Sequence, residues 1–185
     1  KQSVRSIEGT VSAQRVVLDD GRELPADIVV VGVGISPETE LAEQAGLDVD
    51  DGILVDGSCQ ASDPDVFAIG DAARQIDEVT GRRFRFESWQ NAETQASCVA
   101  ASIAGRTQPE RDPIWFWSDQ YDRNLQILGR PSNWENTLTR GAPNDGPFML
   151  FRMDGESLAG VIGINAKREM LLMKKLMNSG KPVDA

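Results

Sequence analysis

The sequence predicts an α/β fold followed by a small α+β domain. Three observations support this prediction: an unbroken β-branched run at residues 28–31, a regular helical pattern over about 90–104, and a change to aromatic, strand-forming sequence after Pro113. A run that is apolar at every position, rather than at alternate ones, indicates a parallel strand with helices on both faces. We therefore expect a parallel sheet first and a separate α+β unit after it.

The chain opens with two predicted strands around a turn. The first strand includes Val11 and residues 15–18, and the Asp-Asp-Gly-Arg segment at 19–22 has the composition of a turn. The second strand is the run at 28–31, which we expect to be buried and parallel to its neighbours.

A short helix over about 37–45 is expected next. Ser36 can cap it, Pro37 suits its first position, and Glu38 complements the helix dipole. Gly46 is a natural stop, because glycine readily adopts the left-handed conformation that ends many helices.

Two further strands and a long helix follow. The strands are predicted at residues 53–55 and 66–69, with an Asp-Pro-Asp turn at 63–65 between them. The helix covers about 90–104 and ends at Gly105. Its apolar positions recur at helical spacing: Ala92, Ala96, Val99, Ala100 and Ile103.

The C-terminal third is predicted to hold a β-hairpin and a final helix. Strand-forming residues at 148–153 and 158–164 flank an Asp-Gly turn. Apolar residues at helical spacing over about 166–178 predict an amphipathic helix, and Gly180 follows as its stop. We place a domain boundary near residue 112, where the composition changes.

Composition and charge exclude several classes of function. The 185 residues carry a net charge of −10 with scattered Lys and Arg, so nucleic acid is a poor candidate partner. No apolar run approaches the ~20 residues that span a bilayer, so we expect no membrane insertion. The N-terminus has neither an initiator Met nor an export signal, which leads us to expect a cytoplasmic location and a chain cut from a longer one.

The side-chain inventory narrows the choice further. The chain has no His, and Cys59 and Cys98 lie 39 positions apart. This spacing fits neither a CxxC pair nor a zinc site, so a metal centre, a catalytic disulfide and a His-based triad are all disfavoured. We expect both thiols to be small core or surface residues in a reducing cytoplasm.

The first candidate site lies in residues 61–71, where a turn and a short apolar segment lead into Gly70 and Asp71. Gly70 allows a ligand to approach the backbone closely, and the Asp71 carboxylate can accept a hydrogen bond from a polyol hydroxyl. A Gly-Asp pair after a strand is more often a simple turn, so the dipeptide alone leaves both interpretations open.

The second candidate is Gly32-Val33-Gly34, directly after the predicted buried strand. Ligands bind at the carboxyl ends of parallel strands in α/β sheets, and glycines let the backbone approach a nucleotide. A GxG pair without the full GxGxxG is more often a packing or turn feature, so this signal is weak alone.

The third candidate combines residues 86–92, where the long helix starts, with the aromatic segment 115–121. A helix N-terminus presents unpaired N–H groups and a positive dipole, which suit the electron-rich edge of a reduced flavin. Trp117 can then stack beside the ring system. An ordinary aromatic core under a domain junction explains the same residues, and composition alone favours it.

Taken together, residues 70–71, 87–92 (Glu-Ser-Trp-Gln-Asn-Ala) and 115–121 (Trp-Phe-Trp-Ser-Asp-Gln-Tyr) resemble the oxygenase-coupled, NAD(P)H-dependent ferredoxin reductases. This group contains putidaredoxin reductase and the aromatic-ring dioxygenase reductases, and the resemblance covers essentially the whole chain. Residues 61–71 are similar to the second flavin fingerprint of such flavoproteins, with Ala61 where the family usually has Thr.

The resemblance implies an FAD-dependent oxidoreductase that passes electrons from NAD(P)H through flavin to a [2Fe-2S] ferredoxin, within an oxygenase system. No catalytic acid or base is implied, because the cofactor performs the chemistry. Gly70 and Asp71 would bind the ribityl region, Trp89 the isoalloxazine, and Trp117 would lie near the nicotinamide site. The full set of implied cofactor-binding residues is Gly70, Asp71, Ser88, Trp89, Trp117 and, along the NAD(P)H path, Gly32 and Gly34.

The same resemblance divides the chain into three parts. Residues 1–34 would be the tail of an NAD(P)H-binding domain and 35–112 the C-terminal part of an FAD-binding domain. Residues 113–185 would form a small α+β reductase domain that covers the flavin and shapes the ferredoxin-docking face. The fold class is then the second half of an FAD/NAD(P)-binding two-domain flavoprotein, followed by a small α+β C-terminal reductase domain.

Neither GxGxxG motif of such enzymes occurs here, so we expect this chain alone to bind FAD weakly or not at all. Two alternatives stay open: a pyridine nucleotide-disulfide or nitrite reductase-type flavoprotein, which shares the Gly-Asp fingerprint, and a non-catalytic docking module. The choice between NADH and NADPH, the ferredoxin, the oxygenase and the oligomeric state are left open too. Arg82, Arg83 and Arg85 are expected to be a solvated charge run rather than a docking patch.

Overall fold

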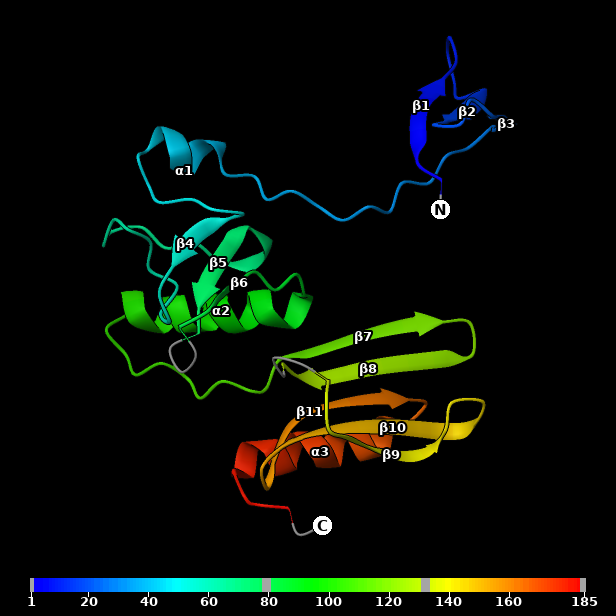
Figure 1. The fold of residues 1–185 in the computed structure, drawn as a ribbon. Helices are drawn as coiled ribbons and strands as arrows, with labels where there is room; N and C mark the ends of the chain where they lie inside the picture. Colours follow the sequence, from blue (N-terminus) through cyan, green and yellow to red (C-terminus); the bar gives the residue numbers. More distant parts are fainter. Residues whose placement is uncertain (1, 78–80, 131–133, 184–185) are drawn as a thin grey trace. The chain divides into compact units, whose positions relative to one another are not determined.

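The computed structural model describes residues 2–77, 81–130 and 134–183. Contacts divide the chain into two compact units, Lys1–Ser36 and Pro37–Ala185. The elements of both units are shown in Figure 1. Five of the seven predicted cofactor-binding residues belong to the second unit, whereas Gly32 and Gly34 belong to the first.

The first unit is a small antiparallel sheet. Its strands follow one another in space as they do along the chain: β1 (Val4–Glu8), β2 (Arg15–Leu18) and β3 (Glu23–Pro25). Glu8 lies opposite Arg15, and the two side chains form an ion pair at 2.6 Å. The strand predicted at 15–18 is confirmed, but Val11 lies outside any strand and is 99% exposed in the connection before it.

The prediction of a buried parallel strand at residues 28–31 is wrong. The run is not a strand, and its β-branched side chains are largely exposed, with Ile28 at 84% and Val30 at 91%. Burial on both faces requires neighbouring strands and covering helices, and the described part of this unit pairs only β1, β2 and β3. Gly32 and Gly34 therefore lie in coil and not at the end of a strand.

The second unit begins with a mixed α/β arrangement. Its elements are α1 (Glu40–Gln44), β4 (Ile53–Val55), the 3-10 turn η1 (Gly70–Ala72), β5 (Ala73–Ile76), β6 (Arg83–Phe84) and α2 (Trp89–Ile103). β4 and β5 pair in parallel, and β5 and β6 pair antiparallel. Val55, Ala68 and Ala73 form a small buried core, and η1 packs against α2.

The short elements of this part differ in detail from their predictions. The helix expected over 37–45 begins only at Glu40, with Thr39 rather than Ser36 at its N-cap, and Gly46 follows its end at φ +75°. The strand expected at 53–55 is confirmed as β4. The one expected at 66–69 is reduced to a single bridge between Phe67 and Gln60, because the chain turns away into η1.

Helix α2 is confirmed, and its buried residues include two amides. Ser88 is the N-cap, and its Oγ accepts a hydrogen bond from the Asn91 N–H at 3.3 Å. The buried residues are Asn91, Gln95 and Cys98, whereas Ile103 is 72% exposed. The groups that this face meets are polar, so amide side chains with hydrogen-bonding partners occupy it.

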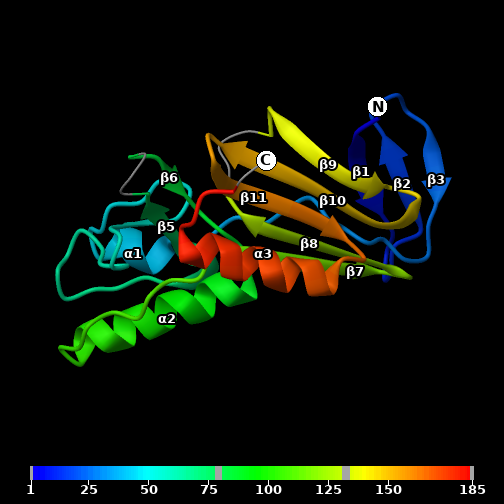
Figure 2. The same cartoon turned by 90° about the horizontal axis from the view of Figure 1, so that it is seen from below.

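The rest of the second unit is a five-stranded antiparallel sheet with one helix. It contains β7 (Trp115–Gln120), β8 (Arg123–Gly129), β9 (Thr137–Ala142), β10 (Asp145–Asp154), β11 (Ser157–Ile164) and α3 (Lys167–Ser179), with sheet order β7-β8-β11-β10-β9. Helix α3 packs along β11 and β8, as Figure 2 shows. Between helix and sheet lies a core of Leu128, Met149, Val161, Ala166 and Met170.

The predictions for this part are confirmed. Strands β10 and β11 form the expected hairpin, with Phe148 opposite Ile164 and Gly155 at φ +58° in the turn. The final helix is α3, which ends at Gly180 with φ +61°. Among the described residues, no helix has the length and apolar content needed to cross a bilayer.

One position in this sheet requires glycine. Gly129, at the end of β8, has φ +77° and donates its N–H to the Ile114 carbonyl at 2.7 Å. A Cβ atom there would lie 2.4 Å from the Ala159 carbonyl oxygen and 2.8 Å from Cε of Met177. The close approach of β8 to both β11 and α3 thus depends on the missing side chain.

Both cysteines are core residues, as expected. Cys59 and Cys98 are free thiols, and each is completely buried. Burial raises the pKa of the Cys59 thiol to about 11. Because both thiols are completely buried, neither has the solvent exposure that reactive cysteines share.

Candidate functional site

The Gly70–Asp71 turn is hydrogen-bonded to the protein interior on one side and exposed on the other. Gly70 has φ +71°, and its N–H donates to Oε1 of Gln95 at 2.7 Å. A Cβ atom on Gly70 would only touch Ala92, at 3.7 Å. The Asp71 side chain is exposed, and within the described residues its carboxylate accepts no hydrogen bond. This carboxylate is therefore available to donors on a ligand.

The first turn of α2 faces the same cavity as Asp71. The cavity has a volume of about 460 Å³ and is lined by Asp71, Glu87, Ser88, Trp89 and Ala92. Ser88 satisfies the Asn91 N–H, which leaves the N–H groups of Trp89 and Gln90 without an acceptor in the described structure. Two donors and the positive end of the helix dipole are thus directed towards a ligand acceptor.

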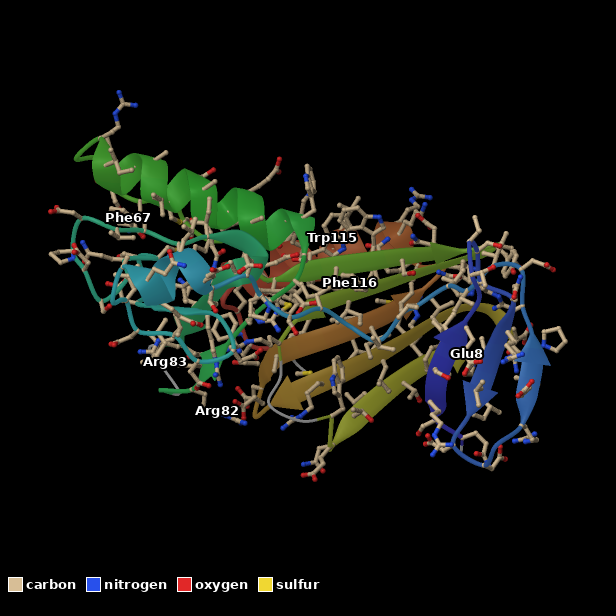
Figure 3. The ribbon with its side chains drawn as sticks, turned by 90° about the horizontal axis from the view of Figure 1, so that it is seen from above. Glu8, Phe67, Arg82, Arg83, Trp115 and Phe116 are labelled. Carbon is tan, nitrogen blue, oxygen red and sulfur yellow. The ribbon has the colours of Figure 1, made fainter. Side chains whose placement is uncertain are left out.

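Arg85 organises the acidic side of this cavity. Its guanidinium forms ion pairs with Glu87 and, at 3.2 Å, with Asp51. The Arg85 side chain is only 10% exposed, and Arg83 donates to the Val55 carbonyl at 3.2 Å. The expectation of a solvated charge run is therefore wrong for Arg85, whereas Arg82 and Arg83 are exposed at the surface near β6 (Figure 3). The pairing with Arg85 neutralises Glu87 beside the cavity.

Three indoles join α2 to β7. The rings of Trp115 and Trp117 stack at 4.7 Å, and Trp117 meets Trp89 edge-to-face at 6.2 Å. The backbone N–H of Trp115 donates to Oε1 of Gln90 at 3.2 Å, and Figure 3 shows Trp115 beside the start of α2. Trp89 is 64% exposed. A buried aromatic core explains Trp115, but the exposed face of Trp89 is what a ring-stacking site requires.

The structure thus brings together most of the predicted site. Gly70, Asp71, Ser88 and Trp89 surround one cavity, and Trp117 joins them through its contact with Trp89. Gly32 and Gly34 belong to the other compact unit, where a Cβ atom on either would meet nothing within 4 Å. Their place on an NAD(P)H path stays a prediction.

Sequence reasoning missed the buried glutamines beneath the turn. Gln95 and Gln75 are 3% and 4% exposed, and Gln95 is the hydrogen-bond acceptor for Gly70. A signal was present in the sequence, because Asn91 and Gln95 are spaced four apart on one helix face next to Cys98. Polar residues in that register indicate an internal hydrogen-bond network rather than a solvent face.

The donor and acceptor set fits a flavin nucleotide. A free carboxylate suits the hydroxyls of a polyol, and helix N-terminal N–H groups suit a carbonyl-rich ring edge. The exposed indole of Trp89, supported by Trp117, offers an aromatic surface to a planar ring. FAD is the cofactor that the sequence resemblance implies, and the residues present are compatible with it.

Comparison with known families agrees with this chemistry. Residues 1–96 match the pyridine nucleotide-disulphide oxidoreductase family, and residues 115–185 match the reductase C-terminal family. The chain therefore belongs to the pyridine nucleotide-disulphide oxidoreductases, with a reductase C-terminal domain after the flavoprotein part.

Individual relatives are ferredoxin reductases. The chain is 38% identical over 181 residues to the ferredoxin–NAD(+) reductase component of the anthranilate 1,2-dioxygenase system of Burkholderia cepacia, covering 97% of this chain and 45% of that protein. It superposes on a chain of the covalent putidaredoxin reductase–putidaredoxin complex with a TM-score of 0.88 and 34% identity, covering 99% and 45% of the two chains.

A third comparison gives the same result. The ferredoxin reductase for the CYP199A2 system of Rhodopseudomonas palustris is 38% identical with a TM-score of 0.86, covering 98% of this chain and 45% of that one. The chain thus spans a little less than half the length of these relatives. The predicted fold class and the resemblance to oxygenase-coupled ferredoxin reductases are confirmed.

Proposed function

We propose that this chain works as the C-terminal part of an FAD-dependent NAD(P)H–ferredoxin oxidoreductase. The observation that carries the proposal is that Asp71, the capped N-terminus of α2 and the Trp89–Trp117 contact converge around one cavity. The names of the relatives support it, because they are ferredoxin reductases and one belongs to a dioxygenase system.

Each residue of the candidate site has a separate part in holding the cofactor. Asp71 accepts hydrogen bonds from ribityl hydroxyls, and Gly70 leaves room for the ligand to approach the backbone. The free N–H groups of Trp89 and Gln90 donate to the polar edge of the ring, and Ser88 keeps that helix turn in shape. Trp117 supports Trp89 and packs on the nicotinamide side.

Bound FAD would supply the redox chemistry: it would take up a hydride from NAD(P)H, and the two electrons would leave singly to two [2Fe-2S] ferredoxin molecules in turn, with release of the proton. The protein's contribution is orientation and electrostatics, and the proposal assigns no residue as a catalytic acid or base. Arg85 offsets part of the acidic charge beside the ring, because its one guanidinium pairs with both Glu87 and Asp51.

The proposal also covers organisation and partners. Residues 1–34 are assigned to an NAD(P)H-binding domain, 35–112 to an FAD-binding domain, and 113–185 to a reductase domain that covers the flavin and shapes the ferredoxin-docking face. Support comes from the two family matches, whose limits at residues 96 and 115 enclose the boundary near 112. A cytoplasmic location and an oxygenase as final electron acceptor complete the proposal.

The test compares Asp71→Asn with Asp65→Asn, an exposed aspartate in the preceding turn. FAD affinity is measured on the 185-residue chain and on the product of the complete reading frame that contains this sequence. We expect Asp71→Asn to weaken binding about tenfold to a hundredfold, the effect of losing hydrogen bonds to a charged acceptor. Asp65→Asn should bind as the unaltered protein does.

The second readout is electron transfer. NADH or NADPH is added anaerobically to the FAD-loaded complete product, and reduction of a [2Fe-2S] ferredoxin is followed by absorbance. Bound FAD without reduction of any ferredoxin would favour a docking module instead. Equal FAD affinity in the two variants would refute the assignment of Asp71.

A further inference from the structure

Two buried glutamines lie directly under the Gly70–Asp71 turn. Gln95 comes from α2 and Gln75 from β5, and both side chains are almost completely buried. Neither has a part in the proposed cofactor contacts. Buried amides are costly unless every donor and acceptor is satisfied, so two adjacent ones call for an explanation.

The amides form a directed relay of hydrogen bonds. The Gly70 N–H donates to Oε1 of Gln95 at 2.7 Å, and Nε2 of Gln95 donates to Oε1 of Gln75 at 3.4 Å. Nε2 of Gln75 then donates to the Gly57 carbonyl at 2.9 Å. The relay connects η1, α2, β5 and the loop after β4, and Nε2 of Gln75 also donates to the Asp56 carbonyl at 3.3 Å and to Sγ of Cys59 at 3.7 Å.

Only one orientation of the two amides satisfies this relay. A backbone N–H can only donate, so Gln95 must present its oxygen to Gly70 and its NH₂ to Gln75. Gln75 must then present its oxygen to Gln95 and its NH₂ to the Gly57 carbonyl. Rotating either amide by 180° would place two donors or two acceptors face to face.

The far end of the relay reaches the connection to the C-terminal sheet. The Gly57 carbonyl also accepts a hydrogen bond from Arg111, in the segment between α2 and β7. The near end holds Gly70 in the left-handed conformation, where an added Cβ atom would meet only Ala92, at 3.7 Å. Because the Gly70 N–H is hydrogen-bonded to Gln95, the Asp71 side chain stays on the side of the turn that faces the cavity.

We propose that Gln95 is the positioning residue of the Gly70–Asp71 turn and that Gln75 locks its orientation. As a statement about flavin binding this rests on the proposed function, but the hydrogen bonds that define it exist without any ligand. Gln95 does not touch the cavity and acts on the ligand only through the backbone of the turn.

The experiment uses the full 185-residue chain labelled with ¹⁵N. Gln95→Met removes both the acceptor for the Gly70 N–H and the donor to Gln75. Gln95→Glu keeps the acceptor for Gly70. Gln75→Met removes only the partner that fixes the orientation of the Gln95 amide. Glu93→Gln, at an exposed position of the same helix, is the matched control. Amide hydrogen exchange at Gly70 is measured by NMR, and FAD is then titrated against the Asp71 and Trp89 amide signals, which detect weak as well as tight binding.

We expect exchange at Gly70 to accelerate roughly tenfold to a hundredfold in Gln95→Met, as for a partly buried N–H that loses its acceptor. Gln95→Glu should restore only part of the protection, because it keeps the acceptor for Gly70 but faces Oε1 of Gln75 with a second acceptor. Gln75→Met should show a smaller acceleration than Gln95→Met, because an unlocked Gln95 still bonds part of the time. FAD affinity should fall in the same order. The Glu93→Gln protein should match the unaltered one in both readouts.

Unchanged exchange at Gly70 in Gln95→Met and Gln75→Met would overturn the proposal. If Gln95→Met fails to fold, Gln75→Met decides, since it leaves the Gly70 contact in place. If exchange responds as expected while no protein shifts with FAD, the positioning of the turn stands, and the titration is repeated on the product of the complete reading frame, where absence of FAD binding would refute the flavin assignment. If exchange responds and FAD binding is equal in all variants, Gln95 has no positioning role for the ligand.

Discussion

A methyl group at Gly129 tests how closely the C-terminal sheet is packed. Replacing Gly129 by Ala would place a Cβ atom 2.4 Å from the Ala159 carbonyl oxygen. That oxygen belongs to the backbone of the adjoining strand, so it cannot move without separating β8 from β11. Gly155→Ala is the matched control, because Gly155 also has positive φ but has nothing within 4 Å of its Cβ position.

The expected magnitudes separate the two variants. A left-handed conformation costs a non-glycine residue about 1–2 kcal/mol. The stiffer unfolded chain offsets about 0.4–1 kcal/mol of this. These two contributions apply to both sites and predict a loss of about 1 kcal/mol at Gly155. Overpacking adds about 1–3 kcal/mol at Gly129 alone, which brings its total loss of unfolding free energy to about 2–4 kcal/mol.

The assay is urea unfolding followed by tryptophan fluorescence, since Trp115 and Trp117 lie on the strand next to β8. The midpoint should fall much further for Gly129→Ala than for Gly155→Ala, with little change in slope. Equal losses in the two proteins would refute the argument, because they would show that the backbone of β11 accommodates the added methyl group.

Three further outcomes are expected. Arg130→Met should lose about 1–2 kcal/mol of unfolding free energy, because Arg130 pairs with Asp77 and lies 3.5 Å from the centre of the Phe84 ring; a double-mutant cycle with Phe84→Leu should recover part of that loss as coupling. Ser88→Ala should cost about 1 kcal/mol by removing the cap of α2, and Ser88→Gly only a few tenths, in the same unfolding assay. Stability should be insensitive to the Cys59 thiol below its ordinary pKa of 9.0 and should fall as pH rises towards the folded value of about 11, because only the unfolded thiol ionises in that window. The loss of unfolding free energy that this thiol causes should approach about 3 kcal/mol. Unfolding midpoints at several pH values measure it, and this contribution should be absent from Cys59→Ala.

Local signals in the sequence predicted the elements that local chemistry determines. The 148–164 hairpin has its turn glycine, α3 has its terminal Gly180, and α2 has apolar residues at helical spacing before Gly105, and all three elements are present. Elements that depend on distant partners could not be predicted in this way. The run at 28–31 has the composition of a buried strand but no neighbouring strand in the described part of its unit.

The candidate site shows the same division. Gly70, Asp71, Ser88, Trp89 and Trp117 were found because each lies in a short motif, and the structure brings them into one compact unit. The glutamines that support them were missed, since their pairing spans separate elements of the chain. Their roles towards a cofactor stay predictions.

The arrangement of the three indoles also has an optical consequence. Two nearly parallel rings at 4.7 Å and a third at right angles bring their electronic transitions within range of one another. Trp115 and Trp117 come from β7 and Trp89 from α2, so the perpendicular partner is present only while helix and strand remain docked. The near-ultraviolet circular dichroism of this protein should therefore contain a contribution from the Trp89–Trp117 pair, and its loss while the Trp115–Trp117 contribution persists would report undocking of α2 from β7.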